Sequence, residues 1–291
     1  MPQHTDISDQ GSITTLPLLF NSQATLTLDP TQHQHPLPHQ YAVHCRSIHP
    51  HPGGSSGIGF AVAKLCLAEK ARVVIASSSQ TKVDGAIKRL REAFPQAEPP
   101  TGYTIDLGSE AVEGKLESLL AEITKAEAEP LDHIVNTAGK PDVRPIRDLD
   151  LGYLATSAQM PLFVPLLVAK LGAKYLREGY RSSLILTSGQ VAEKPMPGYT
   201  VFAAYAAALH GMTRNLACDY APRRVNCVSP GATETELWGD YAEMLRKASV
   251  EKSLLGKAGA PDEVAEAYLY LMKNTDATGS IVSSNAGSIL K

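Results

Sequence analysis

A chain of 291 residues can bury one large hydrophobic core, or at most two modest ones. Hydrophobic residues make up 43% of it and charged residues 20%, which is ordinary usage for a soluble globular protein. The net charge of −3 gives no reason to expect nucleic acid or a membrane as a partner, and no apolar run approaches the ~20 residues that span a bilayer.

The N-terminal ten residues contain two acids and no apolar segment, so we expect no secretory signal. The cysteines Cys45, Cys66, Cys218 and Cys227 lie far apart and show no C-x-x-C spacing. We therefore expect reduced thiols, no metal site and a cytoplasmic protein.

Residues 30–52 differ from the rest of the chain, because six of the nine histidines and five prolines lie there. Three interpretations compete: a metal-binding histidine tract, a flexible leader in which residues 41–48 are forced into a strand, and a gene-model fault that replaces a short apolar strand. We favour the third, since a buried strand should precede the glycine-rich turn and Pro50 and Pro52 oppose one. Residues 1–52 are thus treated as an irregular leader.

From Gly53 onward, short β-branched runs alternate with stretches of helical periodicity. Strands are predicted at residues 72–76, 102–105, 133–135, 183–187, 224–229 and 279–282, and helices at 60–69, 82–94 and 110–126. This alternation predicts a doubly wound parallel α/β sheet of the Rossmann type, as a single domain over residues 53–291.

The glycine-rich run at residues 53–59 opens a predicted helix, and a β-rich run follows within 13 residues. Its glycines permit a tight turn and let the backbone approach a pyrophosphate, to which the helix N-terminus offers free N–H groups. The residues predicted to contact a dinucleotide here are Gly53, Ser55, Ser56, Gly57, Ile58 and Gly59.

This turn resembles the cofactor turn of short-chain dehydrogenases/reductases, although Pro52 stands where that family usually has Thr. Residues 136–139 (NTAG) resemble the family's N-N-A-G turn, residues 224–235 its R-V-N-x-V-x-P-G-x-x-x-T segment, and residues 256–265 and 278–279 its C-terminal pattern. The likeness runs from Gly53 to about Leu290. By this resemblance the further cofactor contacts are Asn136, Ala138, Gly139, Pro230, Gly231, Thr233 and Thr235.

The same resemblance implies a small-molecule substrate and a homodimer or homotetramer, assembled through helices near residues 159–176 and 202–216.

The residues after the strand predicted at 72–76 indicate which cofactor is bound. An acid about 20 residues beyond the glycines usually holds the ribose 2′-hydroxyl of NAD, and residues 77–82 (SSSQTK) contain none. Ser77, Ser78 and Lys82 can instead accommodate a 2′-phosphate, so NADP(H) is favoured over NAD(H). The same serines could simply form a polar turn that caps the next helix. Asp106 resembles the residue that meets the adenine ring, or else caps a turn.

The family's Tyr-x-x-x-Lys pair, which protonates a developing alkoxide, is missing. Alignment by resemblance places Phe202 at the Tyr and Ala206 at the Lys. The Ser position falls on Gly189, directly after Ser188, and the Asn position falls near Ser157. Tyr205 lies one helical turn from Phe202, but without a cation its phenol pKa should stay near ~10.

Two functions from different classes are consistent with this loss. The first is a reductase whose substrate needs no proton, such as an iminium ion, with a carboxylate, Glu193 or Glu234, to complement its charge. The second is a non-catalytic binding or assembly scaffold. The helix around Phe202 is also similar to that of a fungal subgroup in indole-alkaloid pathways, whose members reduce iminium-type intermediates and guide [4+2] cyclisations.

We therefore predict an NADPH-dependent reductase of secondary metabolism, with Glu193, Ser188 and Tyr205 as the candidate catalytic residues. Met196, Tyr199, Phe202, Leu237 and Trp238 are candidates for the pocket wall. His210 is interpreted as a surface or interface histidine rather than a base.

Overall fold

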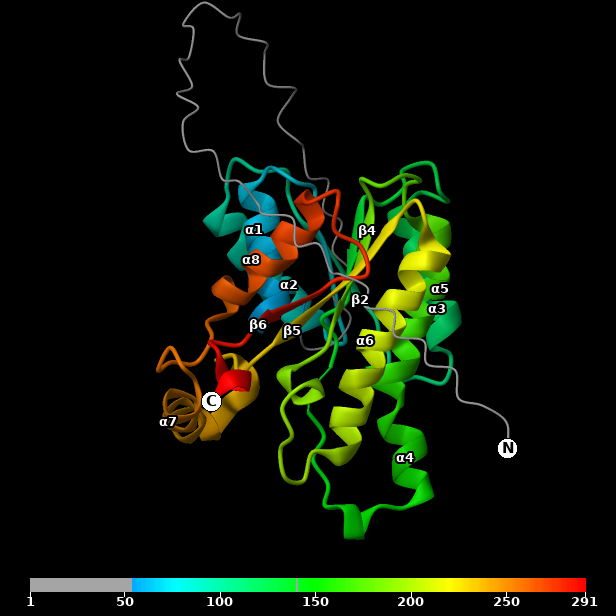
Figure 1. Cartoon of the computed structure of the whole chain (residues 1–291). Helices are drawn as coiled ribbons and strands as arrows, with labels where there is room; N and C mark the ends of the chain where they lie inside the picture. Colours follow the sequence, from blue (N-terminus) through cyan, green and yellow to red (C-terminus); the bar gives the residue numbers. More distant parts are fainter. Residues whose placement is uncertain (1–53, 140) are drawn as a thin grey trace, which may run out of the picture. The chain divides into compact units, whose positions relative to one another are not determined.

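The computed structural model describes residues 54–139 and 141–291 (Figure 1). The predictions made for residues 1–52 and for Gly53 lie outside this range. The strands are β1 (Val74–Ser77), β2 (Thr101–Thr104), β3 (His133–Val135), β4 (Ser183–Thr187), β5 (Arg224–Pro230) and β6 (Ile281–Ser284). The α-helices are α1 (Gly57–Ala68), α2 (Gln80–Ala93), α3 (Val112–Ile123), α4 (Leu151–Ser157), α5 (Val164–Tyr175), α6 (Thr200–Tyr220), α7 (Ala242–Lys252) and α8 (Pro261–Lys273).

Six predicted strands and three predicted helices are confirmed, and their ends differ for identifiable reasons. The strands predicted at 133–135 and 183–187 match to the residue. The last strand begins two residues later than predicted because Gly279 has φ +66°, outside the β region. Similarly, α3 ends early because Lys125, Ala126 and Glu127 all have positive φ.

The strands are all parallel and form two separate sheets, β1–β2 and β3–β4–β5–β6. A Rossmann fold has the strand order 3-2-1-4-5-6, in which the first strand lies between the second and the fourth. Here β2 and β1 take the positions of the third and second strands, and β3 takes that of the fourth. Within residues 54–139 and 141–291, no strand lies between β1 and β3.

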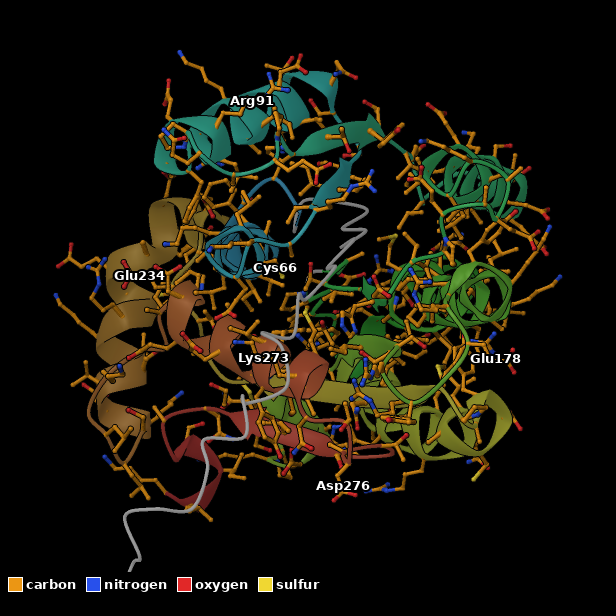
Figure 2. All side chains as sticks on the ribbon, turned by 90° about the horizontal axis from the view of Figure 1, so that it is seen from above. Cys66, Arg91, Glu178, Glu234, Lys273 and Asp276 are labelled. Atoms are coloured by element: carbon orange, nitrogen blue, oxygen red, sulfur yellow. The ribbon has the colours of Figure 1, made fainter. Side chains whose placement is uncertain are left out.

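Helices cover both faces of the strands, as a parallel sheet requires. On one face α1 packs against α8, with α2 beside them, and on the other face lie α3, α5 and α6 (Figure 1). Strand side chains alternate between two cores: Ile75, Val135 and Val228 point to the α1 side. Seen from above, Cys66 of α1 lies inside this packing, whereas Arg91, Glu178 and Asp276 lie at its periphery (Figure 2).

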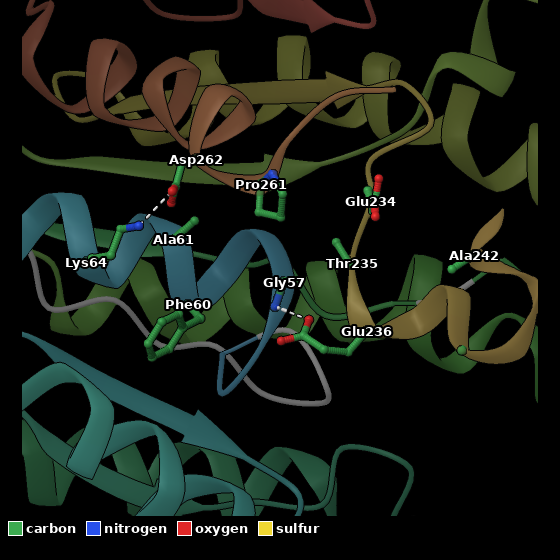
Figure 3. A pocket seen from close by; sticks show the side chains of 11 residues that line it. Gly57, Phe60, Ala61, Lys64, Glu234, Thr235, Glu236, Ala242, Pro261 and Asp262 are labelled. Carbon is green, nitrogen blue, oxygen red and sulfur yellow. Dashed lines mark hydrogen bonds and ion pairs between the residues drawn. The ribbon is translucent and has the colours of Figure 1, made fainter. Parts of the chain in front are cut away.

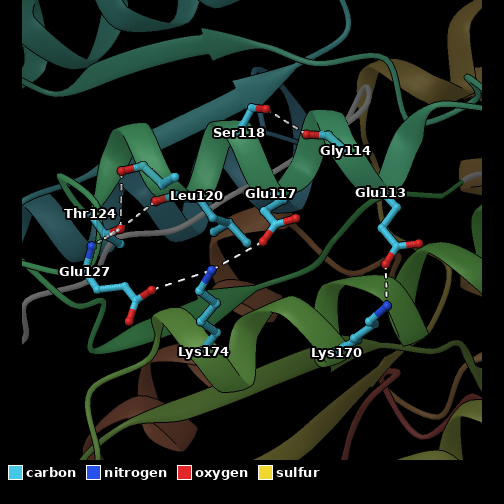
Figure 4. A network of polar contacts seen from close by, with 10 residues as sticks. Glu113, Gly114, Glu117, Ser118, Leu120, Thr124, Glu127, Lys170 and Lys174 are labelled. Carbon is cyan, nitrogen blue, oxygen red and sulfur yellow. Dashed lines mark hydrogen bonds and ion pairs between the residues drawn. The ribbon is translucent and has the colours of Figure 1, made fainter.

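A long apolar helical stretch, Leu151–Tyr175, is formed by α4, a π-helix η2 (Gln159–Phe163) and α5. In length and composition it is sufficient to cross a membrane, with mean hydropathy 1.4. Its α5 part packs in the core through Val164, Val168 and Leu171, among others. Ion pairs of Lys170 with Glu113 and of Lys174 with Glu117 also join the helix to α3, and Lys174 pairs in addition with Glu127, beyond the end of α3 (Figure 4). The core contacts and ion pairs of α5 are those of a helix packed within the domain.

Candidate active site

The glycine-rich turn leads directly into α1. Ser56 is the N-cap residue, in extended conformation and without a side-chain cap, and the helix begins at Gly57. Gly57 has φ +54°, and a Cβ added there would lie 3.0 Å from Thr235 Cγ2. Glycine is therefore required both by the backbone conformation and by the close approach of the segment that follows β5. The first-turn N–H groups of α1 have no partners within the helix and can bind an anion.

Two contacts that sequence reasoning missed hold this turn in place. Arg89 of α2 donates to the Ser55 carbonyl at 2.6 Å, and its guanidinium lies 4.0 Å over the Phe60 ring. The Ser55 hydroxyl donates to the hydroxyl of Ser77, in β1, at 3.2 Å. No local sequence signal distinguishes Arg89 from the other basic residues of α2.

The run after β1 carries no acid, and its serines have different environments. Ser77 is the last residue of the strand and is fully buried, so the predicted polar turn begins one residue later. Ser78 is half-buried, Ser79 is the N-cap residue of α2 without a side-chain cap, and Lys82 is exposed. The half-buried hydroxyl of Ser78 and the exposed ammonium of Lys82 are groups that can bind a 2′-phosphate.

Asp106 follows β2 and caps a turn, because its carboxylate accepts from the Gly108 N–H at 3.0 Å. It also lines a cavity of about 710 Å³ between β2 and α3. Both sequence-based interpretations of this residue are compatible with that position.

The turn at residues 136–139 follows β3 and is fixed by a buried chain of hydroxyl groups. The Asn136 side chain accepts from the Ala138 N–H at 3.1 Å, while its carbonyl accepts from Thr187 Oγ1 at 2.7 Å. Thr187 Oγ1 also lies 2.7 Å from the hydroxyl of Tyr268, a fully buried residue of α8. Sequence reasoning missed Thr187 and Tyr268 in this role.

Residues 230–235 leave the end of β5 and reach the glycine-rich turn. A Cβ on Gly231 would lie 2.7 Å from Asn285 Cα, so only glycine fits there. Thr233 Oγ1 donates to the Gly231 carbonyl at 3.1 Å. Thr235 is the N-cap residue of a 3₁₀-helix, η4 (Glu236–Tyr241). The segment thereby brings Thr235 against Gly57, so two of the predicted cofactor-binding residues lie side by side.

A cavity of about 540 Å³ lies where these elements meet (Figure 3). It is lined by the first two turns of α1, the first turn of α8 and part of the segment 234–242, and it is named the cofactor cavity below for the role that we propose for it. The Gly57 N–H donates to the Glu236 carboxylate at 2.8 Å inside it. Ser188 and the 136–139 turn are not among its lining residues.

Helix α6 presents apolar side chains where the family has its Tyr and Lys. Phe202 is half-buried, with its ring 6.4 Å from that of Tyr199, and Ala206 is buried. The Ala206 carbonyl accepts from the Ser188 hydroxyl at 2.8 Å, so this serine ties the end of β4 to α6. Neither Phe202 nor Ala206 has a side-chain proton to donate.

Tyr205 joins α6 to α4. Its hydroxyl donates to the Leu154 carbonyl at 3.2 Å and lies 3.3 Å from the Ser157 hydroxyl. It therefore contacts Ser157, the residue aligned with the family's Asn, and connects two helices beside the aligned catalytic positions.

The two candidate carboxylates, Glu193 and Glu234, differ in whether a cationic side chain pairs with them. Glu234 forms an ion pair with Arg246, which lowers the pKa of Glu234. Glu193 accepts from the hydroxyls of Ser229 and Ser283, at 3.3 and 3.2 Å, and within the described residues it has no ion-pair partner. Among the residues that the structure describes, a cation thus neutralises Glu234 and none neutralises Glu193.

His210, predicted to be a surface or interface histidine, lies on α6 with only part of its side chain exposed. The residue is half-buried, and its Nε2 atom is buried without a hydrogen-bond partner in the part of the chain that the structure describes. Burial lowers the pKa of the imidazole, an effect that nearby Glu193 opposes and Arg214 reinforces.

Comparison with known proteins identifies the family. The SDR-like Rossmann domain family matches residues 48–291. The chain is 42% identical over 242 residues to the short-chain dehydrogenase/reductase ATR9 of Stachybotrys chlorohalonatus, covering 82% of this chain and 95% of the relative.

Among solved structures, the MalC reductase/Diels–Alderase from Malbranchea aurantiaca has a TM-score of 0.81 and 34% identity, over 87% of this chain and 98% of that one. A small-chain dehydrogenase in complex with NADPH has a TM-score of 0.66 and 26% identity, over 85% of this chain and all of that one. Matches of this extent and identity show that the chain belongs to the short-chain dehydrogenase/reductase family, whose Rossmann fold binds a nicotinamide cofactor.

Proposed function

We propose that this protein is an NADPH-dependent reductase of fungal-type secondary metabolism that transfers hydride to an iminium or similarly activated C=N carbon. The observation that carries the proposal is that one chain combines a retained glycine-rich turn with the loss of the family's proton donor. The cofactor cavity keeps Gly57 and Thr235 together, whereas α6 has Phe202 and Ala206 in place of the proton donor and its lysine.

The chemistry follows from proton balance. Bound NADPH supplies a hydride, which carries both electrons needed to convert an iminium carbon into a neutral amine. No proton is consumed, so a phenol at position 202 would have no task. A ketone, by contrast, becomes an alkoxide and needs a proton donor of suitable pKa.

The chain's own residues supply charge and position. Glu193, whose carboxylate no described cation neutralises, provides the negative charge that favours a cationic substrate. Ser188 fixes the end of β4 against α6 through its bond to the Ala206 carbonyl. Tyr205 contributes to the pocket wall by holding α6 on α4.

The residues present fit a dinucleotide, because the α1 N-terminus already accepts an anion, the Glu236 carboxylate. The absence of an acid after β1 and the presence of Ser78 and Lys82 favour NADPH. The NADPH complex of a relative supports the same choice.

A coupled intramolecular [4+2] cyclisation belongs to the proposal as well. The similar protein from Malbranchea aurantiaca is described as a reductase/Diels–Alderase, which supports it. We further propose a cytoplasmic homodimer or homotetramer built on α5 and α6. Exposed Phe163 and Leu166 on η2 and α5 support such an interface.

The test is a hydride-transfer assay with NADPH and two matched substrates. An N-alkylated dihydroisoquinolinium ion should oxidise NADPH, and a ketone of similar size should not. Efficient reduction of the ketone would contradict the proposal. If the protein binds the cofactor but reduces none of several iminium ions, the alternative, a binding or assembly scaffold, is favoured.

A further inference from the structure

The carboxylate of Glu236 lies at the anion-binding end of α1. It comes from η4, 179 residues later in the chain, and accepts the Gly57 N–H at 2.8 Å (Figure 3). The first-turn N–H groups of a helix, with the partial positive charge of its dipole, favour any anion at this place. The pyrophosphate of a dinucleotide is such an anion, and the glycine-rich turn is where it binds in a Rossmann fold.

The other acids of the cofactor cavity are already neutralised. Asp262 pairs with Lys64 at 2.6 Å, and Glu234 pairs with Arg246. Glu236 has no ion-pair partner among the described residues, and its carboxylate accepts from the N-terminus of α1. The Glu236 carboxylate therefore accepts from the same N–H group, that of Gly57, which we propose for the cofactor's pyrophosphate.

We propose that Glu236 is an internal competitor for the cofactor: in the cofactor-free protein it occupies the pyrophosphate position, and the cofactor displaces it. This inference rests on the proposed binding of NADP(H). Two anions cannot share the position, because the Gly57 N–H that Glu236 accepts can be donated to only one of them and two oxygens cannot occupy the same place. Glu236 thus sets the affinity of the site for its cofactor.

The segment that carries Glu236 can be displaced without uncovering the core. No residue of η4 is buried, and Gly239, with φ 45° and ψ −130°, interrupts its helical conformation. Displacement also moves Trp238, the single tryptophan of the chain, two residues after Glu236. Its fluorescence therefore reports the release of η4.

The experiment measures NADP⁺ and inorganic pyrophosphate binding by calorimetry to the full chain and to Glu236→Gln and Glu236→Ala. Glu243→Gln is the matched control, since Glu243 lies on the exposed side of α7 and pairs with Lys247. Removing the competitor should tighten NADP⁺ binding about tenfold, which is the effect of abolishing a closed state that is populated ~10:1. Glu243→Gln should bind like the unchanged chain.

Tryptophan fluorescence provides the second readout. Saturating pyrophosphate should change the Trp238 emission of the unchanged chain, and Glu236→Ala should show the changed emission before any ligand is added. Unchanged or weaker NADP⁺ binding by both variants would overturn the role of Glu236 while leaving cofactor binding intact. Absence of binding by every protein would overturn both this inference and the proposed cofactor.

Discussion

Ser78 is the residue at which the proposed cofactor preference can be reversed. It is half-buried directly after β1, whereas its neighbour Ser77 is fully buried and bonded to Ser55. Ser78→Asp places a carboxylate where NAD-binding proteins hold the ribose hydroxyls and where a 2′-phosphate would be repelled. We expect NADPH affinity to fall roughly tenfold or more and NADH affinity to rise, as measured by titration of both cofactors. The neutral Ser78→Asn should change the ratio little, and an equal loss in both variants would contradict the charge argument.

His210 makes stability depend on pH in a defined direction. Burial lowers the pKa of the folded imidazole, so the unfolded chain binds its proton first as pH falls. Stability is unaffected well above the unfolded value of ~6.5, and it decreases as the pH falls through and below that value. Urea unfolding across this range should show a shallower decrease for His210→Leu, which neither titrates nor leaves Nε2 unpaired. The same slope in both proteins would assign the pH dependence to other groups.

At the scale of elements, removing the contact between α6 and α4 tests whether Tyr205 has a structural or a catalytic role. Tyr205→Phe removes hydrogen bonds to the Leu154 carbonyl and the Ser157 hydroxyl, at a cost of about 1 kcal/mol of unfolding free energy. We expect hydride transfer to an iminium substrate to change less than about twofold, because no proton is needed. Tyr180→Phe, at an exposed position, is the control for stability. A large loss of rate with unchanged substrate binding would make Tyr205 the proton donor.

Elements that depend on local residues were predictable, and contacts across the chain were not. The strands at 133–135 and 183–187 match because a short β-branched run between turns has one plausible conformation in this fold. The end of α3 was wrong because positive φ at Lys125 and Ala126 leaves no sequence signal.

The same division holds within the site. The glycine-rich turn is a local motif, and the helix predicted after it is present, while the cofactor role of Thr235, also read from a local motif, stays a prediction. Arg89 and Glu236 meet the turn from 34 and 179 residues away, so their roles depend on tertiary packing that one sequence does not contain.

At the scale of the whole molecule, our prediction about residues 30–52 concerns the position between β1–β2 and β3–β6, where the described residues place no strand. A parallel strand buried on both faces contributes several apolar side chains, each worth about 1.5–3 kcal/mol. Replacing residues 46–52 by a run of Val, Ile and Leu should therefore raise the unfolding temperature by roughly 10 °C. A polar run of the same length is the control, and equal midpoints for the two proteins would contradict the proposal.

The two sheets are joined by apolar packing on both faces, which is non-directional and sets no register between them. In the site that we propose, a dinucleotide would cross from the β1–β2 side, near Asp106, to the β3–β6 side, near Thr235. The bound dinucleotide then also holds the two sheets together, so cofactor binding increases the free energy of unfolding. Adenosine 2′,5′-bisphosphate and nicotinamide mononucleotide, each bound to one side, would together protect the chain from heat less than the intact molecule. In a cell poor in the cofactor, the protein would disappear by degradation before its reaction slowed for lack of reductant.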